Sequence, residues 1–519
     1  MEVSNIFKEL KSNKYSFQTC NREVLMKILK DNKDSLIGKK YGFSDIGSME
    51  EYREKVPVSS YKDYRDQVEA MLRGEENLIC SYDIYSILTT SGSGGKRKYI
   101  PISLEALRSY GNVMDRYLQS HVKSCGGKRL FLSFLQTDLT EGTEAAKTML
   151  FTAAYYRYLY ENELIDINTL AGGREGNFFS QFCDYLYVKL WLAFASEDLT
   201  SIESVYLYDF LIFFRYMEDN YDTILNEMAD GRVPERVNLP LSLRKWLESC
   251  RISKDRIHRI RKECSLGFEN IVERLWPSVS LISGIGSKAF RSEEISLQKY
   301  IGNIPVWHYI FAASECLMAV PLKLDSYDLV LWPGSAYYEF LGEDGKPYDP
   351  KDMEEGQCYE ICITNFSGLY RYAMGDIIKL KGYYGEIPVF RYVRRNNLVL
   401  NIAGEKTSMD LLDSAIRRLV EEKKIDLWEY GFYEDYTHLP ASYHGLIAVE
   451  YPTEKDDELS IYFDEILKEA SRDYCELRDL GSIDRAGLEF VDRDYFMKEK
   501  DETIGNFGHS KSHHIWRVK

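Results

Sequence analysis

The chain has 519 residues, of which 45% are hydrophobic and 29% are charged. This balance is typical of soluble, ordered proteins, and the length exceeds one compact core, so we expect two or three lobes. The formal net charge is −16, which argues against nucleic acid or an anionic membrane as a partner, because both are held by clusters of Lys and Arg. A small phosphate-bearing ligand is compatible with this charge, because a few local cations and backbone N–H groups can hold it.

No segment of the sequence has the character of a targeting signal or a membrane span. The first residues, Met1–Glu9, lack the apolar stretch of a signal peptide. The most apolar segment, Leu186–Ala195, contains Lys189 and is shorter than the roughly 18 apolar residues of a spanning helix, so we expect a buried helix there. The ten cysteines form no CxxC pair, which favours reduced thiols. We therefore expect a cytoplasmic protein.

The first 75 residues have the apolar spacing of helices. Ser48 and Glu51 have the spacing of a capping box that begins a helix. A strand is expected at 85–89, directly before a glycine-rich turn. Ser103 is a candidate N-cap for a helix that continues to Val122.

The second half of the chain has more strand signals than the first. After a strand candidate at 130–135, the middle of the chain from 178 to 261 is predicted to be mostly helical. From Trp276 on, short β-branched segments alternate with Gly and Pro, and strand signals are densest between 359 and 400. The residues that follow suffice for a small α+β domain, so the pattern predicts an α/β protein with a mixed-sheet region.

The most informative stretch is Thr89–Lys98, with the sequence TTSGSGGKRK. Its three glycines let the backbone turn sharply and bring N–H groups close to an anion, its hydroxyls can donate to phosphate oxygens, and its cations add positive charge. It lacks the Gly-Lys-Ser/Thr ending of P-loop NTPases. The alternative is a surface turn with a solvated basic cluster, but the strand before it and the extended segment after it favour a phosphate site.

Two later segments carry carboxylates after turns. Phe311–Glu315 is a small-residue turn whose glutamate is a candidate Mg2+ ligand, because this cation prefers oxygen ligands; the alternative is a surface glutamate. Gly368–Asp376 ends in Gly375-Asp376. The carboxylate of Asp376 can accept hydrogen bonds from both hydroxyls of a ribose; the alternative is a common turn dipeptide.

Together these segments resemble the auxin-responsive acyl acid–amido synthetase family, a branch of the firefly-luciferase-like superfamily of acyl-adenylate-forming enzymes. The resemblance covers almost the whole chain, and the segment Gly368–Asp376 matches the family's GLYRYxxGD motif without substitution. The other matching segments are Val56-Pro57, Tyr61, Asp63-Tyr64, Gly74-Glu75, Thr89–Pro101, Phe311–Cys316, Tyr337–Phe340, Tyr392–Asn397 and Glu405–Thr407.

The resemblance implies a fold and a set of binding residues. The fold would be α/β, with a large mixed α/β N-terminal domain, residues 1–394, that contains β-sheets and a β-barrel-like subdomain, and a small mobile α+β C-terminal domain, residues 395–519. The implied cofactors are ATP and Mg2+. Glu315 would hold the metal, and Lys511 would neutralise charge at the α-phosphate, which makes these two the implied catalytic residues. The implied nucleotide-binding residues are Thr90, Ser91, Gly92, Ser93, Gly94, Gly95, Lys96, Lys98, Ala313, Ser314, Glu315, Tyr338, Asp376 and Arg394.

The implied activity has two steps. A carboxylic acid is activated as its acyl-AMP with release of pyrophosphate, and the acyl group then passes to an amine or amino acid to form an amide. Thr152, Tyr155, Tyr156 and Arg157 would help form the acceptor site. Three alternatives stay open: an acyl-CoA synthetase, a ligase that loads a carrier-protein thiol, and a nucleotide-binding protein without catalysis.

The sequence departs from the family pattern at three places. The phosphate loop is one residue short after Gly92, Phe311 stands where the family often has Tyr, and no Pro accompanies Lys511. The nearby cluster of His509, His513 and His514 has no Cys or paired carboxylate at ligand spacing, so we interpret it as part of a tail rather than as a zinc site.

Overall fold

The computed structural model describes most of the chain, and the chain divides into two compact units. The units are Met1–Gly286 with Gln298–Tyr392, and Ser287–Leu297 with Val393–Lys519. The described residues are 16–90, 98–111, 127–133, 135–136, 148–179, 183–285, 297–308, 310–323, 326–395, 399–400, 402, 407–435, 437–438, 440–452, 456–479, 481 and 483–496.

Helices fill the first part of the first unit, as predicted. Ser16 caps the first of them and accepts a hydrogen bond from the backbone N–H of Thr19 at 3.2 Å. Ser48 caps α4 as predicted and accepts from the Glu51 N–H at 3.1 Å; the Glu51 carboxylate accepts from Gly47 N–H at 2.7 Å. The elements are α2 (Phe17–Asp31), α3 (Leu36–Tyr41), η1 (Phe43–Asp45), α4 (Met49–Lys55), η2 (Tyr61–Asp63) and α5 (Arg65–Leu72).

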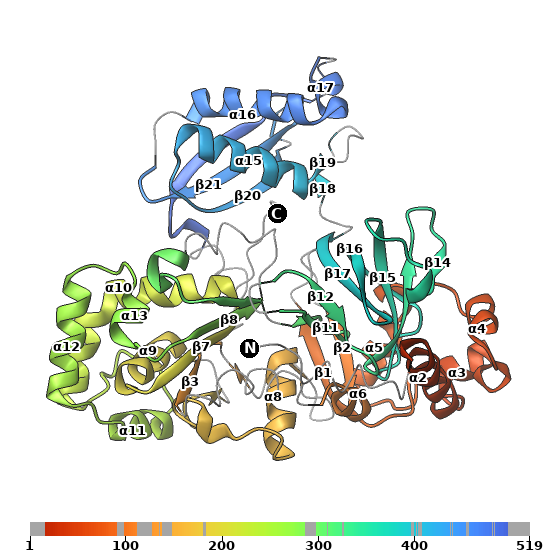
Figure 1. The fold of residues 1–519 in the computed structure, drawn as a ribbon, viewed down its shortest axis with the longest axis horizontal. Helices are drawn as coiled ribbons and strands as arrows, with labels where there is room; N and C mark the ends of the chain where they lie inside the picture. The colour runs from red at the N-terminus through yellow and green to blue at the C-terminus, as the bar shows by residue number, and fades with distance from the viewer. Residues whose placement is uncertain are drawn as a thin grey trace. The chain divides into compact units, whose positions relative to one another are not determined.

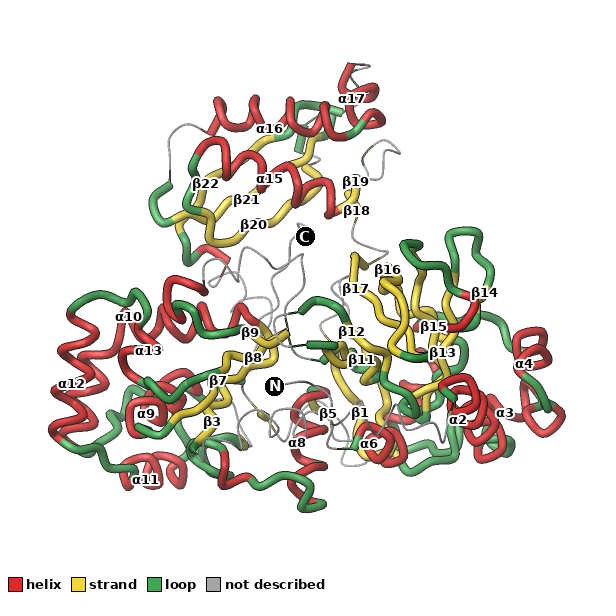
Figure 2. The backbone as a smooth tube through the Cα atoms, in the orientation of Figure 1, coloured by secondary structure: helices red, strands yellow, loops and turns green. Residues whose placement is uncertain are grey.

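Two sheets of the first unit carry the predicted site (Figures 1 and 2). In the smaller sheet, β1 (Ile84–Thr90) pairs antiparallel with β2 (Lys98–Ser103) and parallel with β5 (Thr148–Met149). The larger sheet has eight strands, and α2 packs against its strand β13. In sheet order these are β10 (Phe311–Ala312), β11 (Leu317–Pro321), β12 (Leu329–Leu331), β17 (Ile387–Arg395), β16 (Tyr372–Tyr384), β15 (Cys358–Asn365), β13 (Ala336–Leu341) and β14 (Pro347–Tyr348).

A third, four-stranded sheet of the first unit has parallel neighbouring strands and is packed with helices (Figure 1). Its central strands are buried, as parallel strands covered on both faces must be; Ile202 and Ile282 are both fully buried. The strands, in sheet order, are β3 (Lys128–Phe131), β7 (Leu199–Tyr206), β8 (Leu281–Ile285) and β9 (Val306–His308). The helices are α9 (Tyr185–Ala195), α10 (Leu207–Asp230), α11 (Leu241–Ser249), α12 (Lys254–Ser265) and α13 (Ile271–Leu275).

Residues 178–261 are mostly helical, as predicted, and strand β7 is an exception that the sequence did not indicate. Its sequence, LTSIESVY, is rich in polar residues, which conceals a buried strand. The polar groups are satisfied by tertiary contacts: Glu203 accepts two hydrogen bonds of 2.8 Å from the guanidinium of Arg129 on β3 and one of 2.6 Å from Ser201. A buried charge that is paired in this way is tolerated in a core.

The helix predicted from Ser103 to Val122 is shorter than expected. Ser103 is its N-cap, as predicted, and accepts from the Ala106 N–H at 3.1 Å. The helix α6 (Leu104–Tyr110) ends at Gly111, which has a positive φ of 56°, a value that glycine adopts without the steric penalty of a Cβ. The other elements of the first unit are β4 (Leu135–Gln136), α8 (Phe151–Glu161), η3 (Ile167–Thr169), β6 (Phe178–Phe179) and η5 (Pro350–Asp352).

The second unit is a small α+β structure with its own core. Its helices bury Leu412, Ile416 and Phe463 against the sheet residues Phe432 and Ile447. The β20–β21 pair is antiparallel and the β21–β22 pair is parallel. The elements are β18 (Val399–Leu400), β19 (Thr407–Ser408), α15 (Met409–Lys423), β20 (Leu427–Asp435), β21 (Ser442–Val449), α16 (Asp456–Ala470), α17 (Arg472–Asp479) and β22 (Gly487–Asp492).

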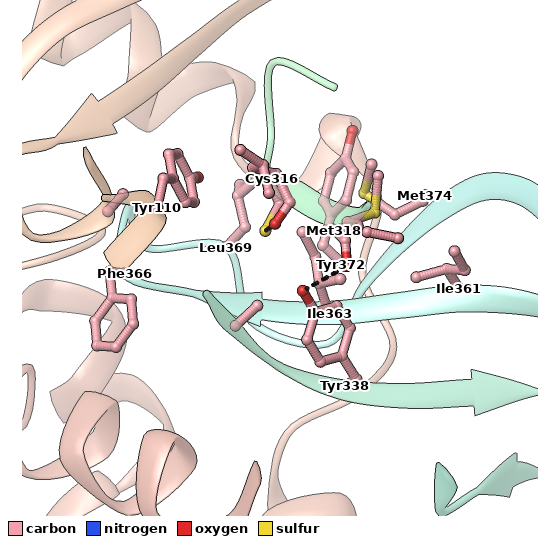
Figure 3. Packing of buried hydrophobic residues seen from close by; sticks show 14 of the residues in the cluster. Tyr110, Cys316, Met318, Tyr338, Ile361, Ile363, Phe366, Leu369, Tyr372 and Met374 are labelled. Carbon is pink, nitrogen blue, oxygen red and sulfur yellow. Dashed lines mark hydrogen bonds between the residues drawn. The ribbon is translucent and has the colours of Figure 1, made fainter. Parts of the chain in front are cut away.

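The core of the first unit joins the large sheet to α6. In Figure 3, Tyr110 of α6 lies near Cys316, and side chains of β11, β13, β15 and β16 continue the cluster. The helix expected at 186–195 is α9, and within the described ranges no helix is long and apolar enough to cross a membrane. The described elements form the mixed α/β fold that the sequence predicted.

Candidate nucleotide and metal site

The predicted phosphate loop connects two neighbouring strands. Thr90, at the end of β1, pairs with Lys98, at the start of β2, so the loop closes a hairpin; Ser91–Arg97 and the side chain of Thr90 lie outside the described residues. The Lys98 ammonium lies over the Tyr61 ring, 5.5 Å from its centroid. Tyr61 in turn accepts from the Tyr99 N–H at 3.0 Å, so β2 and the cation that follows the loop are held by one tyrosine.

Glu315 stands in a tight turn between β10 and β11. Ala313 and Cys316 exchange backbone hydrogen bonds of 2.9 and 3.2 Å across this turn. Glu315 is only 6% exposed, which overturns the alternative of a surface glutamate. Its carboxylate Oε1 accepts from the Tyr372 hydroxyl at 3.3 Å, and the carboxylate forms no ion pair with a described residue. Ala313 and Ser314, in contrast, are partly exposed.

Asp376 is placed by a bulge between β15 and β16. Cys362 pairs with Ala373 and Glu360 pairs with Ile377, so one residue of β15 lies opposite three residues of β16. Gly375 has a φ of 77° in this bulge, and its N–H donates to the Glu360 carboxylate at 2.9 Å. Bulges of this kind re-aim the side chains that follow them; Asp376 is 7% exposed.

The sheet is curved enough to bring these segments together. The β10–β11 turn is at one edge of the eight-stranded sheet, yet Glu315 contacts Tyr372 at the start of β16, with β12 and β17 between them in the strand order. Tyr372 is four positions before Asp376 on the same strand. The two predicted ligand carboxylates are therefore connected through a single strand.

Two family domains match the chain. The GH3 family N-terminal domain matches residues 6–306, and the GH3 family central domain matches residues 329–395. The chain belongs to the GH3 family. It is 25% identical over 493 residues to indole-3-acetic acid-amido synthetase GH3.17 of Arabidopsis thaliana, with 84% of this chain and 79% of the relative covered. It is 26% identical over 422 residues to indole-3-acetic acid-amido synthetase GH3.8 of Oryza sativa subsp. indica, with 76% and 69% covered.

Solved structures share the GH3 fold. AtGH3.15 acyl acid amido synthetase in complex with 2,4-DB superposes with a TM-score of 0.87 at 22% identity, over 99% of this chain and 93% of that one. 2-Hydroxyisobutyryl-CoA ligase in its postadenylation state with 2-HIB-AMP superposes with a TM-score of 0.51 at 11% identity, over 97% and 89%. The predicted family and fold class are confirmed, and with the amido synthetase relatives so is the class of enzyme, an AMP-forming ligase.

Other predicted GH3 site residues are placed less directly. Tyr338 is fully buried in β13, and its hydroxyl is hydrogen-bonded to Ser335 Oγ at 2.6 Å and to the Trp332 carbonyl at 3.2 Å. Its hydroxyl is therefore engaged inside the sheet. Arg394 is in β17 and its side chain lies outside the described residues, as does the whole of Lys511 with its neighbouring histidines.

The predicted acceptor residues all come from α8 but point to different surroundings. Tyr155 is buried and donates to the Gly111 carbonyl at 2.7 Å. Tyr156 is buried with its ring 5.0 Å from that of Phe131. Thr152 is half-buried, and Arg157 donates to the Glu161 carboxylate at 2.7 Å on the partly exposed face. The acceptor role of this group stays a prediction.

Sequence reasoning missed a buried ion cluster inside the GLYRYxxGD motif. Arg371 has a φ of 45°, and its guanidinium donates to both carboxylate oxygens of Glu339 at 3.1 and 3.2 Å. It also donates to the carbonyls of Arg53 and Val56 at 2.9 and 2.8 Å. The one sign of this cluster in the sequence was the arginine itself, a charged residue within an otherwise apolar segment. Its contacts hold the start of β16 against the end of α4.

Cys316, next to Glu315, is not a nucleophile. Burial raises the pKa of its thiol to about 12, so the thiol stays protonated at neutral pH and lacks the thiolate that nucleophilic chemistry requires. We therefore expect no nucleophilic role for Cys316.

Proposed function

We propose that this GH3 enzyme uses ATP and Mg2+ to activate a small carboxylic acid as its acyl-AMP, and then conjugates the acyl group to the amine of an amino acid. The observation that carries the proposal is Glu315, a carboxylate that is nearly buried, makes one hydrogen bond and has no cationic partner among the described residues. Burying an unpaired charge is costly, and a divalent cation would relieve this cost. The carboxylate oxygens of Glu315 are also of the ligand type that Mg2+ prefers.

In the first step, the substrate carboxylate attacks the α-phosphorus and pyrophosphate leaves. The protein supplies position and charge neutralisation for this step rather than a nucleophile. Lys98 and the phosphate loop would hold the phosphates, Asp376 would accept hydrogen bonds from the ribose hydroxyls, and Lys511 would neutralise charge at the α-phosphate. When bound, Mg2+ would offset the charge of the triphosphate.

In the second step, an amine attacks the acyl-AMP carbonyl and AMP leaves. The relatives named as indole-3-acetic acid-amido synthetases support an amine acceptor. The fold alone does not discriminate, because a CoA ligase shares it. We propose that the amine acceptor binds near α8. On this helix Thr152 and Arg157 are partly exposed, whereas Tyr155 and Tyr156 are buried.

Two further proposals concern the setting of the reaction. The second unit, from Val393 on, contains Lys511 and would move between the two steps, as conformational gating requires. The nine described cysteines are free, which supports a reducing compartment such as the cytoplasm.

The proposal is tested by identifying the product. The purified enzyme is incubated with ATP, Mg2+, a panel of aryl, indolyl and aliphatic acids, and either a mixture of amino acids or CoA, and products are detected by mass spectrometry. We expect at least one acid to yield an N-acyl amino acid together with AMP. A thioester that forms only with CoA, and no amide with any amino acid, would contradict the amine acceptor.

A further inference from the structure

Asn365 holds the backbone of the residue that we propose as metal ligand. It is the last residue of β15 and is fully buried. Its Nδ2 donates to the Glu315 carbonyl at 2.7 Å, a short bond between residues that are 50 positions apart in the sequence. The turn that contains Glu315 is therefore attached to the end of β15 through its backbone.

The other end of the same amide organises the turn between β15 and β16. Asn365 Oδ1 accepts from the Ser367 N–H at 2.9 Å and from the Leu369 N–H at 3.0 Å. Both acceptor positions of the amide oxygen are thus used. Gly368 in this turn has a φ of 94°, and a Cβ there would lie 2.9 Å from the backbone of Ile79, so the turn fits closely against its surroundings.

This turn also contacts the strand that follows the phosphate loop. Ser103, the last residue of β2, donates from its hydroxyl to the Phe366 carbonyl at 2.9 Å. Its N–H donates to Ser367 Oγ at 3.1 Å. The turn 365–369 is therefore bonded to β2 on one side and to the Glu315 turn on the other, and it continues directly into the strand that carries Asp376.

We propose that Asn365 is a positioning residue for the reaction, a role that rests on the proposed function of Glu315 as metal ligand. Its amide fixes the position of the Glu315 turn relative to β16, the strand that carries Asp376. It thereby sets the distance between the Glu315 carboxylate, which would bind the metal, and the Asp376 carboxylate, which would bind the ribose. Groups that orient a metal ligand without touching the metal typically change metal affinity by 10–100-fold when they are altered.

The substitution Asn365→Asp separates the two functions of this side chain. The aspartate keeps an oxygen for the Ser367 and Leu369 N–H groups, so the turn is retained, but it loses the donor to the Glu315 carbonyl. The matched control is Asn32→Asp. Asn32 is also fully buried, donates from Nδ2 to the Ile28 carbonyl at 2.8 Å and accepts from the Ser81 N–H at 2.7 Å, at the end of α2.

The test is a Mg2+ titration of acid-dependent pyrophosphate release for both variants and the native enzyme. We expect Asn365→Asp to raise the KM for Mg2+ about tenfold, with a smaller effect on kcat at saturating Mg2+, and Asn32→Asp to leave the KM for Mg2+ unchanged. An added negative charge acting only through its field would lower the KM for Mg2+, so the direction of the change separates positioning from charge.

The Glu315→Gln variant distinguishes a failure of this inference from a failure of the proposed function. If Glu315→Gln raises the KM for Mg2+ but Asn365→Asp does not, or lowers it, the positioning role is wrong and the metal site stands. If Glu315→Gln leaves the Mg2+ dependence unchanged, the proposed metal ligand itself is wrong. Equal changes in KM for Asn365→Asp and Asn32→Asp would show a general loss of stability and would also overturn the positioning role.

Discussion

Tyr372 is the side chain through which β16 reaches the Glu315 carboxylate, at an oxygen–oxygen distance of 3.3 Å. We predict that Tyr372→Phe raises the KM for Mg2+ several-fold, because a carboxylate that loses an orienting donor samples more positions. The measurement is the KM for Mg2+ in pyrophosphate release.

Tyr370→Phe is the control for this change. Tyr370 is two residues away, is also buried, and donates to the Ile79 carbonyl at 2.9 Å. Its loss should cost about 1 kcal/mol of stability, as for a typical buried hydrogen bond, without changing the KM for Mg2+. Equal KM values for the two variants would argue that Tyr372 only packs.

At the scale of single residues, the sequence named candidate carboxylates but gave no sign of the contacts that hold them. Glu315 and Asp376 were identified because turn residues before a carboxylate are visible in a sequence. The partner of the Glu315 carbonyl, Asn365, was not, because a single asparagine in a strand gives no sign of a contact 50 residues away. Arg371 was part of a matched motif, but its ion pair with Glu339 depends on the packing of two strands.

Helix α9 contains a buried lysine, Lys189, whose titration should make the free energy of unfolding depend on pH. Burial lowers the pKa of Lys189 to about 7, and its amine donates to the Gly176 carbonyl at 3.0 Å and to Asn177 Oδ1 at 2.7 Å. In the unfolded chain this lysine titrates at its usual value of 10.5. Between pH 7 and 10.5 the unfolded state therefore binds more protons, and Lys189 contributes a free energy of unfolding that rises with pH by at most about 1.4 kcal/mol per unit.

The variant Lys189→Met isolates this contribution. We predict that its free energy of unfolding exceeds that of the native enzyme near pH 7 by more than it does at pH 9, because only the native chain gains from the rise in pH. Urea unfolding of both proteins at the two pH values measures the difference. A difference that is the same at pH 7 and pH 9 would show that Lys189 keeps an ordinary pKa.

At the scale of elements, local signals predicted the helix starts at Ser48 and Ser103 and the strand before the phosphate loop. These features depend on caps and turns that lie within a few residues of each other. Strand β7 was missed because its polar residues are satisfied by Arg129 on another strand. The end of α6 at Gly111 was missed because the helical pattern continues in the sequence beyond that residue.

At the scale of the whole chain, the order of the motifs carried the prediction of family and enzyme class. What the sequence did not contain is the curvature of the eight-stranded sheet, which brings the β10–β11 turn to β16. Curvature depends on bulges such as the one at Gly375. Their combined effect over eight strands cannot be predicted from any one segment of the sequence. The contacts of Glu315 with Tyr372 and Asn365 therefore arise only in the folded sheet.

The central claim is that this chain forms acyl-AMP with Glu315 as the metal ligand. It is tested most directly by the exchange of labelled pyrophosphate into ATP, measured over the acid panel for the native enzyme and for Glu315→Gln. We predict exchange that requires both an acid and Mg2+, and at least a tenfold lower rate for Glu315→Gln at subsaturating Mg2+. ATP binding without exchange for every acid, or exchange by Glu315→Gln at the native rate, would contradict it.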